Sequence, residues 1–414
     1  MVYFDRNHEK TAVGSKTGAD ELRYDVIIVG AGPAGFAAAL GAVQTGKKVL
    51  LLDRNSGPGG VAVYCGCPVF AGMTDFDPDQ LGGAAGGFAA AMKNHAFIQQ
   101  GQTLNSSEFE IGLCMTRMLR KAGVDLLFYA ELTGAEVADR AIRGISVSCC
   151  GETLQLEAGA YVDATGDAVL SRLAGVEILP NSEDETMTKT VLFRVSGVKN
   201  YDKKVQKEVF SKRKFPFPFQ NRFMGTPVGD GSEILLNLTA VSGDALKPFE
   251  LTRMDIELRE QIPVILDWVR KNLPGFEDCR LTAVAPVIGV RASCNVKGRE
   301  IITCQDLELG TPVSEPVAMA KRSYGGHYIY RFESPWGSHT GGPRAIPYGA
   351  LLPAGLENLS VGGRCISIET RAVSAVRMMP VCMATGQAAG IAAAMGFPAY
   401  PELKNELIRQ KCHF

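Results

Sequence analysis

The stretch Tyr24-Asp-Val-Ile-Ile-Val-Gly-Ala-Gly-Pro-Ala-Gly35 decides the fold of the first domain. Its apolar run, residues 24–30, predicts a fully buried parallel strand. Gly30 makes a tight turn, Gly32 lets the backbone approach a pyrophosphate, and Gly35 lets the following helix pack close to the strand. Small residues over 33–44 predict that helix, and its first N–H groups would face the phosphates.

A second buried strand is predicted over residues 48–53, and it ends on Asp53, 18 residues after Gly35. An acid at this place can accept hydrogen bonds from ribose hydroxyls. Strand, glycine turn, helix, strand and acid follow one another within about 30 residues, which predicts a dinucleotide site. Pro33 and Ala34 at the start of the helix, and Arg54 beside the acid, are assigned to the same site.

Three later stretches favour FAD over NAD as the dinucleotide. The first is a double glycine a few residues after the acid, the second is a turn that ends another predicted buried strand, and the third is a late strand followed by a small-residue helix. These stretches contribute the following candidate cofactor residues: Gly59, Gly60, Val61, Thr165, Gly166, Asp167, Gly363, Arg364 and Gly386.

With these motifs the chain resembles the FAD-dependent oxidoreductases of the glutathione-reductase-like superfamily. It is most similar to the branch with a DATGD strand, here residues 163–167, and a C-terminal GRciS…GqAAG segment, here residues 363–390. The resemblance implies an α/β fold, with a Rossmann FAD-binding domain and an inserted α+β substrate domain. It also implies non-covalent FAD that accepts or donates a hydride. Relatives often carry a histidine where this chain has Thr370, so no catalytic role is transferred to that position.

The order of these motifs divides the chain into four parts. Residues 1–23 are an N-terminal extension without the apolar run of a signal peptide. Residues 24–180 and 342–414 form the two parts of the FAD-binding domain. The substrate or cap domain, residues 181–341, mixes short strands with one long polar helix, expected near 248–272.

Catalytic candidates lie in glycine-rich, aromatic loops of the substrate half. His327 and His339 have the ordinary pKa range of a general acid or base at neutral pH. Arg344 re-enters the cofactor domain and can pair with a substrate carboxylate or hydroxyl through its guanidinium. Arg291 either anchors substrate or ties the two domains by a salt bridge, and Tyr348 is assigned to substrate binding.

Cys65 and Cys67 follow the double glycine and are interpreted as walls of the flavin pocket on the substrate side. A thiol-disulfide reaction through Cys67 is the alternative. Disulfide reductases carry two cysteines after the double glycine, and Cys67 falls near the second of these positions, but Ala62 occupies the first. A third possibility is a non-catalytic FAD-binding protein. The cysteines form no paired CxxC…CxxC array, so no metal site is predicted.

The leading hypothesis is therefore an FAD oxidoreductase that transfers a hydride between flavin N5 and a small organic substrate. The reaction is either dehydrogenation of an alcohol or amine, or reduction of an activated double bond. A net charge of −1 and a pI of 6.6 argue against a nucleic-acid partner. We expect a cytoplasmic protein without a membrane span, served by a separate electron donor or acceptor. Self-association into a homo-oligomer is left open.

Overall fold

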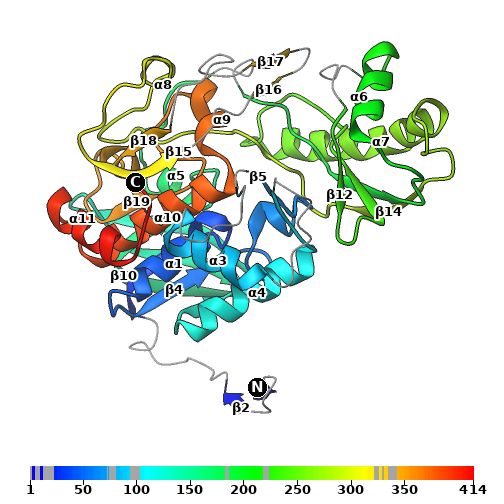
Figure 1. Cartoon of the computed structure of the whole chain (residues 1–414). Helices are drawn as coiled ribbons and strands as arrows, with labels where there is room; N and C mark the ends of the chain where they lie inside the picture. Colours follow the sequence, from blue (N-terminus) through cyan, green and yellow to red (C-terminus); the bar gives the residue numbers. More distant parts are fainter. Residues whose placement is uncertain are drawn as a thin grey trace.

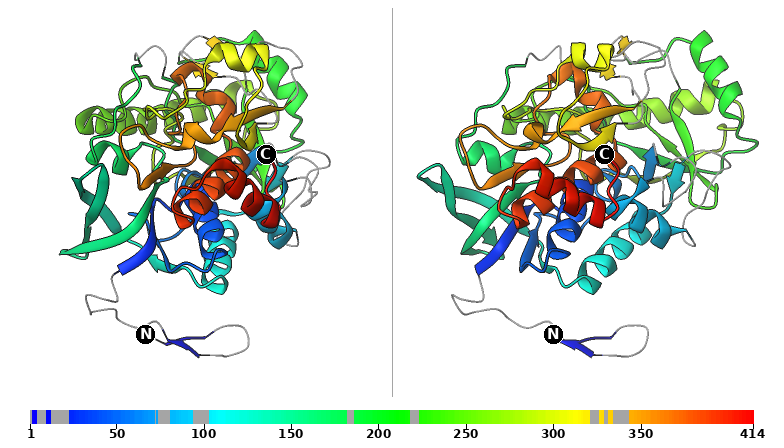
Figure 2. Two further views of the ribbon diagram at one scale, coloured as in Figure 1. Left: turned by 90° about the vertical axis from the view of Figure 1, so that its left-hand side faces the viewer. Right: turned by 60° about the vertical axis from the view of Figure 1, so that its left-hand side comes forward.

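The computed structural model describes residues 2–4, 10–12, 23–71, 73, 81–93, 103–181, 186–217, 223–320, 326–328, 331–333 and 343–414. A larger unit with a parallel sheet and a smaller unit built on a second sheet lie side by side (Figure 1; two further views in Figure 2). Over these ranges, no helix has the length and apolarity needed to cross a bilayer.

The sheet of the larger unit confirms the predicted mixed α/β fold with a parallel sheet. Its parallel strands have the order β7-β4-β3-β10-β19. Their bounds are β3 Arg23–Val29, β4 Val49–Leu52, β7 Asp125–Leu127, β10 Glu152–Asp163 and β19 Leu359–Val361. The side chains of β4 and the inner half of β3 are buried, as their apolar runs predict.

The apolar pattern before Asp163 predicts a meander of four short strands at 126–129, 135–137, 142–148 and 153–156, followed by a buried strand at 161–166. The structure forms this meander from three antiparallel strands. The segment near residues 126–129 does not join the meander, because β7 pairs in parallel with β4. The expected strands at 153–156 and 161–166 are one strand, β10. Its first half pairs antiparallel with β9 (Ala141–Cys149), which in turn pairs with β8 (Ala130–Ala138), and its second half pairs in parallel with β3. Small residues at 158–160 break the apolar pattern without turning the chain.

Two glycines allow the first helix to lie against the last long one. Helix α1 (Pro33–Val43) and helix α10 (Met379–Ala394) match the small-residue helices predicted over 33–44 and 379–395 within two residues. A Cβ on Gly386 would overlap the carbonyl oxygen of Ala34, and one on Gly390 would overlap that of Ala38. Any side chain at either glycine would therefore force the two helix backbones apart.

The smaller unit is an antiparallel sheet of order β12-β13-β11-β14, covered by helices α6 and α7. Helix α7 (Pro248–Asn272) has the bounds predicted for the long polar helix. The other bounds are β11 Phe193–Ser196, β12 Gly225–Val228, β13 Glu233–Leu236, β14 Arg280–Val284 and α6 Lys203–Lys212.

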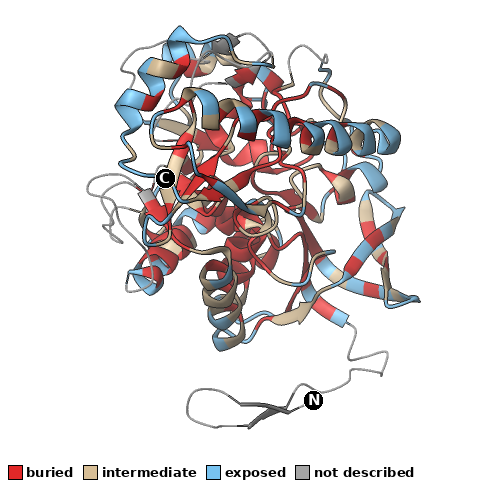
Figure 3. Cartoon of the chain, turned by 90° about the vertical axis from the view of Figure 1, so that its right-hand side faces the viewer, coloured by how far each residue is buried: buried red, intermediate tan, exposed pale blue. Residues whose placement is uncertain are grey.

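Each unit has its own hydrophobic core, seen as buried interiors in Figure 3. The second core takes its buried residues from 191–288, and the first takes them from both sides of that range, 24–187 and 292–407. The chain therefore leaves the larger unit once and returns to it. The predicted domain boundaries near 180 and 341 stay a prediction.

The remaining elements lie outside the two main sheets. The sequence predicts a helix that starts near Ser107, capped by Ser106 or Ser107 and with Glu108 and Glu110 in its first turn. Helix α4 begins after Ser107, whose hydroxyl accepts a hydrogen bond from Glu110 N. The other bounds are β1 Val2–Phe4, β2 Lys10–Ala12, β5 Val69–Ala71, α3 Gly83–Met92, β6 Thr103–Asn105, α4 Glu108–Lys121, α5 Val169–Leu173, α8 Cys304–Leu309, β15 Pro316–Ala320, β16 Gly326–Tyr328, β17 Arg331–Glu333, β18 Arg344–Pro347, α9 Val373–Val376 and α11 Tyr400–Arg409.

Candidate functional site

The glycine turn has the backbone geometry that its three glycines predict. Gly30 has a φ of +97°, and a Cβ there would lie 2.7 Å from the carbonyl oxygen of Ala164. A Cβ on Gly60 would lie 2.7 Å from the Cα of Gly32, so the double-glycine turn packs directly on the first turn. Helix α1 begins at an N-cap glycine that offers no capping side chain. The cradle thus leaves space and N–H donors for a ligand phosphate.

Asp53 holds this turn in place from the end of β4. Its Oδ2 accepts a hydrogen bond from Ala31 N at 2.6 Å, and its Oδ1 accepts bonds from Asn55 N and Nδ2, both at 2.8 Å. The carboxylate is buried, whereas the neighbouring Arg54 is exposed. These bonds give Asp53 a positioning role, and its bond to a ribose hydroxyl stays a prediction.

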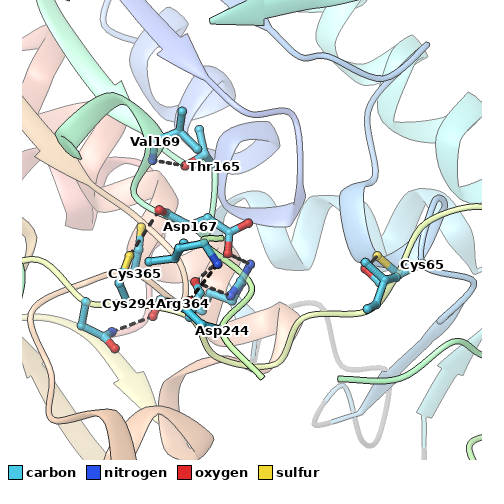
Figure 4. Close-up of polar contacts among 12 residues, drawn as sticks. Cys65, Thr165, Asp167, Val169, Asp244, Cys294, Arg364 and Cys365 are labelled. Atoms are coloured by element: carbon cyan, nitrogen blue, oxygen red, sulfur yellow. Dashed lines mark hydrogen bonds and ion pairs between the residues drawn. The ribbon is translucent and has the colours of Figure 1, made fainter. Parts of the chain in front are cut away.

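Asp167 and Arg364, predicted separately as cofactor residues, form an ion pair with each other (Figure 4). Arg364 Nη2 lies 2.6 Å from Asp167 Oδ1, and the Ser293 hydroxyl donates to the same oxygen at 2.6 Å. Burial alone would raise the pKa of Asp167, but Arg364 and Ser293 together hold it below its ordinary value. The guanidinium also lies against Gly166, where a Cβ would approach Nε to 2.8 Å.

The late glycines complete the same cradle. Gly363 has a φ of +88°, its N–H donates to Thr385 Oγ1 at 3.1 Å, and a Cβ there would lie 3.0 Å from the Cβ of Ala34. Gly386 lies against the Ala34 backbone, so packing of α10 on α1 accounts for this glycine. The structure thus brings the segments 30–35, 59–60, 164–167 and 363–364 together around the start of α1. Val61 is partly exposed beside them.

Two buried hydroxyls follow this cradle, at Thr370 and Ser374. Neither Thr370 Oγ1 nor Ser374 Oγ has a hydrogen-bond partner among the described residues. A buried polar group without a partner costs about 1–3 kcal/mol, so a bound polar ligand would stabilise this segment. Together with the glycine cradle and the uncapped α1, these hydroxyls fit a bound FAD.

The two candidate cysteines are half-buried thiols near the smaller unit. Cys65 Sγ donates to Ile288 O at 3.4 Å, and burial raises its pKa to about 12. Burial also raises the pKa of Cys67. All the cysteines of the chain are free thiols in the structure. Since the thiolate is the reactive form, these pKa shifts favour wall residues over the thiol-disulfide alternative.

Arg291 lies at the junction of the two units, and Thr188 connects it to His327. Its Nη1 donates to Thr188 O at 2.7 Å and to Thr188 Oγ1 at 3.2 Å, and its Nη2 donates to Asn237 Oδ1 at 2.9 Å. Thr188 N in turn donates to His327 O at 2.7 Å. Arg291 and His327, predicted from different motifs, therefore share Thr188 as a neighbour. The salt bridge proposed for Arg291 between domains is not among its contacts.

The remaining candidates fall elsewhere or outside the described residues. Arg344 Nε donates to Leu307 O at 2.7 Å, at the end of α8, where a cation suits the helix dipole. Tyr348 is buried, and burial raises its pKa to about 12. His339 lies outside the described residues.

Sequence reasoning missed Ser293, Thr188 and Asn237. Ser293 stands two residues after Arg291, so a strand period would have placed it on the same side. Thr188 and Asn237 come from segments about 50 residues apart and carry no motif.

Comparison with known proteins places the chain among flavoproteins. A family model described as FAD dependent oxidoreductase matches residues 25–399. Digeranylgeranylglycerophospholipid reductase 1 of Methanococcoides burtonii is 28% identical over 195 residues, 42% of this chain and 45% of the reductase. The soluble pyridine nucleotide transhydrogenase of Hahella chejuensis is 46% identical over 46 residues, 11% of this chain and 10% of the transhydrogenase. The matched stretches thus span less than half of these curated relatives.

Solved structures agree on the fold. The flavin-dependent brominase Bmp2 has a TM-score of 0.50 at 14% identity, over 94% of this chain and 83% of the brominase. The anhydrotetracycline hydroxylase OxyS of Streptomyces rimosus has a TM-score of 0.50 at 12% identity, over 94% of this chain and 66% of the hydroxylase. Because the family model runs from the glycine turn almost to the end of the chain, the protein belongs to the FAD-dependent oxidoreductases, and it is an enzyme with FAD as its cofactor.

Proposed function

We propose that the protein transfers a hydride between FAD and a small organic substrate bound where the two units meet. The observation that carries this proposal is the chain of contacts from Arg291 through Thr188 to His327. The segment 288–293, which includes Arg291, also contacts Cys65 and the Asp167–Arg364 pair. The proposal includes a glutathione-reductase-like arrangement in which residues 181–341 are the inserted substrate domain. Two separate cores, the second drawn from within that range, support it.

Bound FAD supplies a two-electron acceptor or donor at flavin N5. In the oxidative direction a substrate C–H bond breaks, its electron pair leaves with the hydrogen, and the hydroxyl or amine proton passes to the His327 imidazole as a C=O or C=N bond forms. In the reductive direction an activated carbon–carbon double bond gains the hydride, and His327 gives the proton to the neighbouring carbon. Arg291 positions the substrate, and a separate electron donor or acceptor restores the flavin.

Residues of the cradle hold the cofactor in this proposal. The N–H groups at the start of α1 would bind the pyrophosphate, Asp53 would accept from a ribose hydroxyl, and the Asp167–Arg364 pair would help to hold the rest of the dinucleotide. The half-buried Cys65 and Cys67 close the substrate side. Their raised pKa keeps both thiols protonated at neutral pH, so they shield the site from water without reacting.

Anaerobic stopped-flow reduction of the FAD-loaded protein tests the proposal. A panel of alcohols and amines is mixed with the oxidised protein, and a panel of activated alkenes is mixed with the dithionite-reduced protein. We expect at least one compound to change the visible flavin absorbance. A hydroxylase and a brominase share the fold, so each active compound is also assayed with oxygen.

His327→Gln is the informative variant, and Arg253→Gln on the outer face of α7 is its matched control. We expect His327→Gln to slow flavin reduction by about 10²–10⁴-fold with FAD content unchanged, as loss of a general base does. Arg253→Gln should keep the wild-type rate. The proposal is overturned if dithionite reduces the flavin but no organic compound exchanges electrons with it. Loss of turnover in Cys67→Ser alone would favour thiol chemistry.

A further inference from the structure

Arg291 differs from the partly buried Arg364 and Arg194 in having no carboxylate beside it among the residues that the structure describes. The side chain is only 8% exposed, and its three hydrogen bonds reach the Thr188 carbonyl and hydroxyl and the Asn237 amide oxygen. Arg364 pairs with Asp167, and Arg194 pairs with Glu108 and Glu233. Among the described residues, every acceptor for Arg291 is neutral.

The guanidinium of Arg291 also keeps donors in reserve. A guanidinium has five N–H donors, and the three bonds involve only Nη1 and Nη2. The Nε hydrogen and one Nη2 hydrogen have no acceptor among the described residues. Nε and Nη2 lie on one edge of the guanidinium plane, and that edge can bind both oxygens of a carboxylate at once.

Burial of this cation without an anion is costly, and the neighbourhood adds to the cost. Burial and the nearby Arg377 lower the pKa of Arg291 to about 9. The guanidinium therefore still carries its charge at neutral pH, in a place where a charge is normally paired. The next residue after Thr188, Lys189, is fully buried as well, and its Nζ donates to Thr186 Oγ1 at 3.1 Å.

The position of Arg291 ties this charge to the proposed active site. Three residues before it, Ile288 O accepts from Cys65. Two residues after it, Ser293 donates to Asp167, the partner of Arg364 (Figure 4). On the other side, Thr188 links it to His327. Arg291 thus lies between the residues proposed to hold FAD and the residue proposed to move the proton.

We infer that the substrate is a carboxylate, and that its carboxylate group pairs with the free edge of Arg291. The inference rests on the proposed function, because it names the substrate class of the same site. The planar, two-oxygen shape of a carboxylate matches the two remaining donors. The test has two competing outcomes, in which the partner of Arg291 is an anionic flavin or a phosphate.

Binding of paired probes to the FAD-loaded, oxidised protein tests the inference without turnover. Acetate, lactate and benzoate are each compared with the corresponding amide in a carboxylate-free buffer, by titration calorimetry and by perturbation of the flavin absorbance. Inorganic phosphate is the third arm. Each amide keeps the shape of its carboxylate but lacks the charge. We expect at least one carboxylate to bind about tenfold or more tightly than its amide, since a charge-assisted bond to a buried cation supplies that discrimination.

Two variants separate the charge from the fold. Arg291→Gln removes the cation, and Asn237→Asp places a carboxylate where the amide oxygen already accepts from Nη2 at 2.9 Å. Asn237→Asp changes almost no volume, so it serves even if Arg291→Gln does not fold. Each variant should reduce the carboxylate preference by about tenfold to a hundredfold and leave amide binding unchanged. Arg253→Gln, an exposed arginine paired with Glu257, is the control that keeps the preference.

The outcomes distinguish the two proposals. The inference is overturned if no carboxylate binds better than its amide while FAD is bound, or if phosphate alone shows the Arg291-dependent binding. It is also overturned if Arg291→Gln lowers the flavin midpoint potential without changing carboxylate selectivity, because the flavin would then be the anion. A neutral compound that exchanges electrons with the flavin independently of Arg291 would leave the proposed function standing and remove only the inference.

Discussion

The Asp167–Arg364 pair gives the sharpest prediction about stability and cofactor binding. The two side chains are 27% and 18% exposed, so the pair is partly buried in the absence of a ligand. Removing one partner of a fully buried pair costs about 3–5 kcal/mol, whereas an exposed pair contributes about 1 kcal/mol or less. We therefore expect Asp167→Asn or Arg364→Gln to lower the free energy of unfolding by about 2–3 kcal/mol.

The double variant measures the coupling energy between Asp167 and Arg364. With both charges removed no cation is left uncompensated, so Asp167→Asn/Arg364→Gln should recover part of the loss, with a coupling energy of about 1–3 kcal/mol. Urea unfolding of the apoprotein and of the FAD-loaded protein gives each corner of the cycle. The loss should be larger with FAD bound, because the proposed site covers the remaining exposed surface of the pair. The exposed pair of Lys199 and Asp278, joined at 2.8 Å, is the control and should leave unfolding unchanged.

The stabilisation by the Asp167–Arg364 pair should depend on pH. The pKa of Asp167 is lowered in the folded protein, so its contribution is present above the ordinary pKa of an aspartate, near 3.9, and is lost as the pH falls through the lowered value. The difference between the protein and Asp167→Asn should hold steady from about pH 5 to 8 and shrink below about pH 4. Additive single losses, or a difference that grows on acidification, would refute the account of the pair.

Two further predictions concern packing and thiols. Gly386→Val should abolish soluble, FAD-bound protein, because the new side chain would overlap the Ala34 backbone. The control is Gly87→Ala on α3, where the nearest atom is Met118 Cε at 3.7 Å, and this variant should express and bind FAD normally. Equal FAD content in both variants would contradict the packing argument. Iodoacetamide at pH 7.5 should label the exposed Cys150 first and leave Cys65 and Cys67 unmodified in the folded protein, as read by peptide mass spectrometry, and early labelling of Cys67 would argue for an accessible thiolate.

Local patterns in the sequence predicted the cofactor half of the molecule well, because its elements are specified by neighbours along the chain. An apolar run followed by Gly30 predicts a strand and a turn, and Ser107 before two acids predicts the start of α4; both are confirmed. The meander is confirmed for three of its four strands, but the end predicted at residue 156 is wrong, because small residues at 158–160 look like a break in the apolar pattern. What continues that strand is pairing with β9 and then β3, which no local pattern encodes.

The substrate half could be predicted only as a set of candidates, for the same physical reason. In the sequence, Arg344 and Arg291 are both arginines whose guanidinium can pair with a substrate. The structure separates them, since one caps the end of α8 and the other lies buried against Thr188 and Asn237. Which arginine faces a ligand depends on contacts between segments about 50 to 100 residues apart, and such contacts leave no spacing to read.

The connection between the two units explains why the strongest site residues come from every part of the chain. The cradle at the start of α1 needs small residues on three sides, supplied by Gly60, Gly363 and Gly386, since a Cβ at any of them would strike the backbone or Ala34. In the proposed arrangement these glycines surround the FAD site, and a cradle of small residues offers few side chains that could select a substrate. Selection must therefore come from the smaller unit, through the segment that returns from it, and Arg291 is the buried charge on that segment. Substitutions in the two regions should therefore have different effects. Substitutions in the cradle should abolish FAD binding, whereas substitutions around Thr188 and Asn237 should change which substrate is bound.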